Sequence, residues 1–198
     1  MSSTTNGNRV RVLSVTKSTG GLSHYNTELC KRLDRDRFDV HVICLSDNNV
    51  AYAEKLKAMG IKATPMDMER YAISVTSDLR LFNELRSFLK ENDYDVVIGH
   101  GSKAGFLVRV LERFTDTPAI YALASMSFVP RIHGRKAHIY RQLERMGAFA
   151  GGHIVTVAHA TRDALLEHNI TKPEGVTAIH TGIDIDKFTP TLSQADAK

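Results

Sequence analysis

Apolar and polar positions along the chain follow two alternating patterns. Short, continuous apolar runs recur along its length, and each is followed by a stretch with apolar residues three or four positions apart. The first pattern favours buried strands, and the second places side chains on one face of a helix. Strands are expected at residues 10–15, 38–45, 61–66, 94–98, 118–123, 154–157 and 176–179.

Helical stretches separate these predicted strands. The first carries Leu22, Tyr25, Leu29 and Leu33 at helical spacing, and similar stripes mark the later ones. The later helices are expected at residues 52–59, 79–89, 104–114, 139–146 and 161–167. This alternation predicts an α/β fold with a doubly wound, mostly parallel, Rossmann-like sheet of about seven strands, covered on both faces. Residues 67–76 are the least regular internal stretch and are expected to form a loop over the site.

Composition places the chain among soluble globular proteins. Its 198 residues fit one domain, and 42% hydrophobic and 24% charged residues are ordinary proportions. No apolar run approaches the roughly 18–20 residues of a membrane span. The polar residues 1–8 carry no apolar leader and are expected to be a disordered lead-in. Together with only two cysteines, these features indicate a cytoplasmic location.

Positive charge is concentrated in one segment. The net charge is +4, and residues 131–145 hold five basic residues against one glutamate, which accounts for the whole excess. The basic residues are Arg131, Arg135, Lys136, Arg141 and Arg145. Two interpretations stay open: a solvated helix face, or a surface for phosphates or an anionic membrane. Few aromatic residues interleave with the charges, which disfavours nucleic acid.

A glycine pair follows the first predicted strand, in the segment Lys17-Ser-Thr-Gly-Gly-Leu22. Gly20 and Gly21 allow the backbone to approach a ligand closely, and the helix N-terminus after them offers N–H donors. A phosphate or a sugar hydroxyl suits such a loop, although a tight turn explains the pair equally well. The segment is neither a dinucleotide fingerprint nor a P-loop.

A second candidate, Gly99-His-Gly-Ser-Lys-Ala-Gly105, begins at the end of the fourth predicted strand and enters a helix. His100 is expected to face the ligand, because ligands of such sheets bind beyond the strand ends. Ser102 can cap the helix, and Lys103 adds charge at the same edge. The nine histidines are scattered and the cysteines are not paired in a motif, so no metal site is expected.

The segment Thr181-Gly-Ile-Asp184, followed by Phe188, comes after the last predicted strand. Together with the glycine loop and the His-Gly-Ser-Lys-Ala-Gly segment, in this order, it resembles the N-terminal domain of family 4, GT-B type glycosyltransferases. Glu144, in a Leu-Glu-Arg helix, fits the same order. The resemblance covers residues 9–190. Within the family, the chain is similar to the capsule, exopolysaccharide and lipid-linked sugar transferases. It implies an acceptor-side domain over residues 9–190, with residues 191–198 as a linker.

The resemblance implies a function as well as a fold. It implies the acceptor-binding half of a retaining glycosyltransferase that moves a sugar from a nucleotide-sugar to a hydroxyl of a sugar or lipid-linked acceptor. It implies no cofactor, and a donor site mainly in a C-terminal domain supplied in cis or in trans. We therefore expect this chain to be inactive alone. Some members of the family bind membranes peripherally through a basic surface of this domain. The resemblance to them implies that the basic segment reaches an anionic membrane, with Phe128, Ile139 and Tyr140 as apolar contacts.

The resemblance also assigns roles to residues. Thr19, Gly20 and Gly21 correspond to the loop at the donor phosphate or acceptor, and His100, Ser102 and Lys103 to the second segment. The fifth predicted strand departs from the family pattern, because Ala124 stands where a histidine usually faces the acceptor. Ser125 and Ser127 are the substitutes. His100 is the best candidate for a catalytic group.

Two alternatives to this transferase remain open. One is a stand-alone, non-catalytic Rossmann-like module that recruits a separate catalytic domain or binds a phosphorylated ligand. The other is a protein similar to nucleotide-sugar epimerases or dehydrogenases. The lack of a dinucleotide fingerprint disfavours the second.

Overall fold

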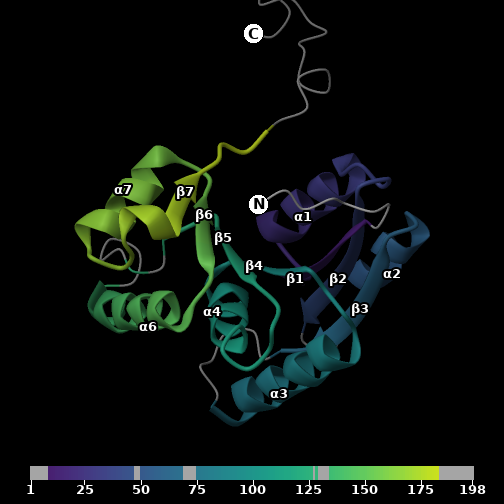
Figure 1. Cartoon of the computed structure of the whole chain (residues 1–198), viewed down its shortest axis with the longest axis horizontal. Helices are drawn as coiled ribbons and strands as arrows, with labels where there is room; N and C mark the ends of the chain where they lie inside the picture. Colours follow the sequence, from purple (N-terminus) through teal and green to yellow (C-terminus); the bar gives the residue numbers. More distant parts are fainter. Residues whose placement is uncertain (1–8, 47–49, 69–74, 127, 129–133, 183–198) are drawn as a thin grey trace, which may run out of the picture.

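A computed structural model of the chain describes residues 9–46, 50–68, 75–126, 128 and 134–182 (Figure 1). Its seven strands form one parallel sheet in the order β3-β2-β1-β4-β5-β6-β7. The strands are β1 (Val10–Lys17), β2 (Phe38–Ser46), β3 (Lys62–Asp67), β4 (Val96–His100), β5 (Ala119–Leu123), β6 (His153–Thr156) and β7 (Val176–Ala178). The predicted parallel, Rossmann-like sheet is therefore confirmed. The predicted lead-in, the linker, Ile183 and Asp184, and residues 69–74 of the predicted loop lie outside the described residues.

Helices pack on both sides of this sheet (Figure 1). They are α1 (Gly21–Arg32), α2 (Ala51–Ala58), α3 (Val75–Glu91), α4 (Ser102–Leu111), α6 (Ala137–Ala150) and α7 (His159–Glu167). Helices α1 and α2 lie over one face at β1 to β3, and α3, α4, α6 and α7 lie over the other. The strand order reverses direction between β1 and β4, so this pair is the switch point where such sheets bind ligands.

Part of the sheet is covered on a single face. Strands β1 and β2 bury successive residues, whereas β4, β5 and β6 alternate between buried and half-buried positions. Ile98, Ile120 and Val155 are among the half-buried positions. On their side of the sheet α1 reaches β4 at His100, and no helix of the described residues lies over β5 and β6 (Figure 1). The prediction of a sheet covered on both faces is therefore wrong for β5 and β6.

A buried ion pair joins α4 to α6. Arg109 is fully buried and Glu144 is 4% exposed, and 2.7 Å separates their Nη2 and Oε2 atoms. The Tyr121 hydroxyl of β5 donates to the other oxygen of Glu144 at 3.0 Å, and the guanidinium lies 4.3 Å from the centre of the Tyr121 ring. Burial, with Glu144 beside it, raises the pKa of Tyr121 well above its usual value, so the phenol stays protonated and can donate.

Two glycines make room for this cluster. A Cβ atom at Gly105 would lie 1.9 Å from the Tyr121 ring, and one at Gly147 would lie 2.6 Å from the Arg109 guanidinium. Any larger side chain would separate α4 from β5 or from α6, because interiors are close-packed.

The sequence locates α6 correctly, but its apolar stripe lies on the exposed side. Ile139, Met146 and Phe149 are 55%, 59% and 85% exposed, whereas Ala137, Glu144 and Gly147 are buried. The physical reason is the buried arginine of α4, which needs a carboxylate and a small neighbour opposite it rather than an apolar ridge.

Replacing Glu144 by alanine should lower the free energy of unfolding by about 3–5 kcal/mol, because the Arg109 charge is left buried without a partner. Urea denaturation measures the loss. Glu91→Ala, at an exposed position of α3, is the control and should leave stability nearly unchanged. A double variant, Arg109→Met with Glu144→Leu, should recover much of the loss. Equal effects of Glu144→Ala and Glu91→Ala would contradict the assignment.

Candidate functional site

The carboxyl ends of β1 and β4 lie side by side at the switch point, and each leads into a helix through a glycine. Gly20 precedes α1 with φ 79° and ψ −162°, and Gly101 precedes α4 with φ 80° and ψ 169°. Only glycine adopts this backbone region without strain. The two connections therefore have the same local geometry, and both helix N-termini meet the same edge of the sheet.

The glycine loop after β1 is exposed and open. Thr19, Gly20 and Gly21 all lie on the surface, and a Cβ atom at either glycine would have nothing within 4 Å. The Ser23 hydroxyl donates to the carbonyl of Gly20 at 2.8 Å, which fixes the first turn of α1. The predicted loop thus has free space beside it at the carboxyl edge of the sheet.

Behind this edge, three polar side chains form a buried cluster. The Asn26 amide of α1 donates to Ser14 Oγ of β1 at 2.6 Å and to His100 Nε2 of β4 at 3.2 Å. Ser14 Oγ lies 3.1 Å from the same Nε2. All three residues are at most 2% exposed. His100 was expected to face the ligand, but the structure places it under α1.

These contacts fix the state of the imidazole. An amide NH₂ group only donates, so Nε2 accepts and Nδ1 carries the proton. Among the described residues this buried Nδ1 has no hydrogen-bond partner. Burial lowers the pKa of His100 to about 4, so the ring is neutral at pH 7. Such a group is suited to positioning Asn26, and with it α1, against β4.

The other predicted site residues are divided between the edge and the core. Ser102 is the first residue of α4, and its Oγ lies 3.5 Å from the Tyr121 hydroxyl without capping the helix. Lys103 forms an ion pair with Asp78 of α3. Ser125 and Ala124 are exposed beyond β5. Ser127 lies outside the described residues.

The basic segment is only partly a free surface. Lys136 is exposed, but Arg145 donates to the carbonyls of His168 and Asn169 at 2.7 and 3.2 Å and so caps the end of α7. Arg141 is half-buried, and Arg131 and the side chain of Arg135 lie outside the description. Phe128 is fully buried, so the predicted apolar contact from this residue is wrong.

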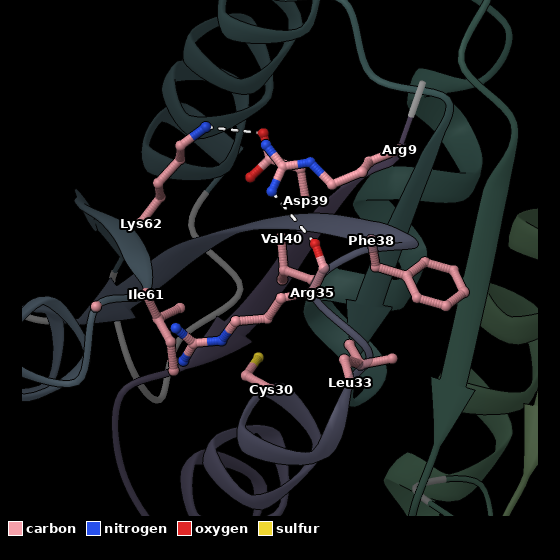
Figure 2. Close-up of a pocket in the computed structure, with 10 residues that line it drawn as sticks. Arg9, Cys30, Leu33, Arg35, Phe38, Asp39, Val40, Ile61 and Lys62 are labelled. Atoms are coloured by element: carbon pink, nitrogen blue, oxygen red, sulfur yellow. Dashed lines mark hydrogen bonds and ion pairs between the residues drawn. The ribbon is translucent and has the colours of Figure 1, made fainter. Parts of the chain in front are cut away.

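Two cavities lie at opposite edges of the sheet. One, of about 280 Å³, lies beside the glycine loop and is lined by Ser18, Ser23, His24, Thr27, Ala51, Tyr52 and Lys55. The other, of about 250 Å³, is at the amino ends of β1 to β3 and is lined by residues that include Arg9, Arg35, Asp39 and Lys62 (Figure 2). Sequence reasoning identified neither cavity, because their linings come from separate elements. The glycine pair was the one signal that pointed to the first.

Metal and membrane features are limited in the described part of the chain. It contains no group of three or more His, Cys, Asp or Glu side chains that could hold a metal ion. None of its helices is long and apolar enough to cross a membrane.

A family model and a curated relative both indicate glycosyltransferases. The model for Glycosyltransferase Family 4 matches residues 19–187. The UDP-Gal:alpha-D-GlcNAc-diphosphoundecaprenol alpha-1,3-galactosyltransferase of Escherichia coli is 21% identical over 181 residues, which cover 90% of this chain and 46% of that protein. The chain thus spans about half the length of this curated relative.

Solved structures share the fold at low identity. Anabaena Alr3699/HepE in complex with UDP and glucose has a TM-score of 0.67 and 17% identity, over 92% of this chain and 47% of that one. A UDP-GlcNAc 2-epimerase from Neisseria meningitidis bound to UDP-GlcNAc has a TM-score of 0.61 and 13% identity, over 87% and 47%. A protein named as an epimerase therefore shares the fold of this half, and the fold alone does not indicate the reaction.

The buried, neutral His100 should make stability fall in acid. Its folded pKa of about 4 lies below the unfolded value of about 6.5, so the stabilising contribution is complete above pH 6.5 and is lost as pH falls toward 4. The loss is on the order of 3 kcal/mol. Urea denaturation at several pH values should show a weaker dependence in His100→Gln than in the wild type.

Comparing variants cancels the contribution of other groups, such as His41, whose pKa burial also lowers. His138→Gln, at an exposed position of α6, is the control and should keep the wild-type dependence. Identical pH profiles for the wild type and His100→Gln would show that the histidine is not held neutral by burial.

Proposed function

The chain belongs to Glycosyltransferase Family 4, and we propose that it forms the acceptor-binding half of a retaining transferase that moves a sugar from a nucleotide-sugar to a hydroxyl. The observation that carries this proposal is the pair of glycine-capped helix N-termini at the switch point. Helix N-termini offer N–H donors and partial positive charge to phosphates and sugar hydroxyls. This edge is where sheets of this kind bind ligands.

The names of similar proteins support a ligand class. The E. coli relative is named for UDP-galactose and a GlcNAc-diphospholipid, and the Anabaena structure contains UDP and glucose. We propose a UDP-sugar as the donor and a lipid-linked sugar as the acceptor, with a role in polysaccharide synthesis at the cytoplasmic side of a membrane. No cofactor or metal takes part in this proposal.

The exposure of each residue decides the role that we propose for it. Thr19, Gly20, Gly21 and Ser125 are exposed at the edge and contact the acceptor or the donor phosphates. Ser102 and Lys103 begin α4 at the same edge. The structure buries His100, our candidate for the catalytic group, so we assign it to positioning: the neutral ring holds α1, and thus the glycine loop, against β4.

A second domain would complete the site. Transition-state stabilisation needs groups on both sides of the reacting atoms, held in fixed orientation. The half-buried apolar side of β4 to β6 is surface that a further segment can cover. In this proposal the donor binds mainly to that second domain, supplied in cis or in trans, and the chain alone does not turn over.

A chimera tests this proposal. Residues 1–190 joined to the second half of the E. coli relative should transfer sugar from UDP-galactose to a GlcNAc-diphospholipid, while the 198-residue chain should bind that acceptor without turnover. Release of UDP measures transfer, and fluorescence anisotropy of a labelled acceptor measures binding. Acceptor binding without any transfer by the chimera would favour a non-catalytic binding module. Absence of acceptor binding would contradict both.

Gly21→Val is the matched variant for this experiment. The position has open space and an ordinary φ, so valine should fold but fill the space where the ligand binds. We expect at least about tenfold weaker acceptor binding, corresponding to about 1.4 kcal/mol, with an unchanged melting temperature. Unchanged affinity would remove the glycine loop from the site.

We also propose that α6 approaches an anionic membrane. Ile139, Met146 and Phe149 are all more than half exposed on this helix, and Lys136 is exposed at its start. Exposed apolar residues beside cations are typical of helices that lie in the lipid headgroup region. Arg145 does not serve this surface directly, because it caps α7.

Phe149→Ser should weaken binding to phosphatidylglycerol vesicles by about tenfold or more, because burying a Phe side chain contributes roughly 1.5–3 kcal/mol. Co-sedimentation measures this, with phosphatidylcholine vesicles for comparison. Leu79→Ser, at another exposed apolar position on α3, is the control and should bind like the wild type. Equal binding by all three proteins would exclude α6 as the membrane contact.

A further inference from the structure

The cavity beside the glycine loop lies between the first turns of α1 and α2. Ser18 comes from the end of β1, Ser23 and His24 from α1, and Tyr52 and Lys55 from α2. Both helices follow the carboxyl ends of neighbouring strands, so both bring the positive end of a helix dipole to the cavity. Among the described residues, two basic side chains, His24 and Lys55, line it, and no carboxylate does.

The inner wall of this cavity is held in place by hydrogen bonds. The Tyr52 hydroxyl donates to the carbonyl of Ser23 at 2.9 Å and lies 3.2 Å from Thr27 Oγ1. Burial raises the pKa of Tyr52 to about 12, so the phenol stays neutral and remains a donor. This contact ties the first turn of α2 to that of α1, and the cavity is therefore formed without a ligand.

Two groups at the cavity have no partner in the described part of the chain. Ser18 Oγ is buried and makes no hydrogen bond there, although the Ser18 backbone N–H donates to the carbonyl of Leu45 at 2.8 Å. Lys55 makes no ion pair with a described residue, whereas Lys57, two positions further on, pairs with Glu54 at 2.9 Å. A buried hydroxyl without a partner is costly, and a ligand acceptor atom would relieve that cost.

In the second cavity, by contrast, basic side chains have partners within the protein (Figure 2). Its lysine, Lys62, pairs with Asp39 at 2.8 Å. Arg35 donates to the carbonyl of Met59 at 3.3 Å, and Arg9 donates to the carbonyl of Arg35 at the same distance. This cavity lies where α1 and α2 end, so its cations compensate the negative ends of two helix dipoles. The positive charge in this second cavity therefore stabilises the fold.

We propose that the cavity lined by Ser18, Ser23, His24 and Lys55 binds the phosphate group of a sugar phosphate. Phosphate supplies several acceptor oxygens, which match the hydroxyl and ammonium donors and the two helix N-termini. A volume of about 280 Å³ is at the small end of ligand sites, which suits a phosphorylated sugar rather than a whole nucleotide-sugar. We assign this phosphate to the acceptor, and that assignment, unlike the site itself, rests on the proposed function.

Nuclear magnetic resonance titration of the 198-residue chain with inorganic phosphate, at constant ionic strength set with chloride, tests the site. Saturable shifts should appear at the amides of residues 18, 23–24 and 52–55. Lys55→Gln should raise the phosphate Kd about tenfold or more, because it removes a charged hydrogen-bond donor to the phosphate. Lys57→Gln, on the same helix with its charge already paired, is the matched control and should stay within about twofold.

Ser18→Ala gives a second, independent test. It should weaken phosphate binding without lowering the melting temperature, because the hydroxyl that it removes has no partner in the free chain. The proposal is overturned if the Lys55→Gln and Lys57→Gln chains bind phosphate equally, or if the shifts map to the cavity around Arg35 and Gly60.

Two further ligands distinguish the source of the phosphate. With glucose 1-phosphate as the probe for a sugar phosphate, Lys55→Gln should weaken binding, while UDP binding should be unaffected. If Lys55→Gln weakens UDP binding instead, the cavity stands as a phosphate site but its assignment to the acceptor is wrong. These readouts do not use transferase activity, so they remain valid if the proposed function fails.

Discussion

The buried pair of Arg109 and Glu144 is the constraint on which the second half of the domain depends. An unpartnered charge in this position would be far more costly than a surface charge, so α4, α6 and β5 can pack only in the register that brings guanidinium, carboxylate and the Tyr121 hydroxyl together. Gly105 and Gly147 provide the necessary space. Because α4 is fixed by this cluster, its glycine-capped N-terminus is held at the switch point. The candidate site therefore depends on an interaction remote from it.

The sequence predicted the fold well, because strand and helix periodicities are local. All seven strands and the parallel sheet agree with expectation. The site was predicted less completely, for reasons visible at particular residues. The strand-end position of His100 suggested contact with ligand, but the direction of its side chain depends on Asn26 and Ser14, far away in sequence. Likewise the apolar stripe of α6 does not reveal that a buried arginine faces its other side. The partner of a buried polar group cannot be read from periodicity alone.

Opposite edges of the sheet differ in electrostatics, and this difference connects the fold with the proposed function. At the amino ends of β1 to β3 the helices end, and the cations there are engaged by carbonyls and Asp39 (Figure 2). At the carboxyl ends the helices begin, and Ser18 and Lys55 have no partner among the described residues. Anionic and hydroxyl-rich ligands are favoured at the second edge for this reason. In the proposed function, this edge forms one wall of a site for sugar transfer.

In the proposed function, the carboxyl edge at β1 and β4 contacts the acceptor. Hydrogen–deuterium exchange of the chain with and without a water-soluble GlcNAc-diphospholipid analogue tests it most directly. Increased protection should appear at residues 18–24, 52–55 and 101–105, with no change at residues 33–40 and 60–62. Protection at the second set alone, or protection of neither set at saturating ligand, would contradict it.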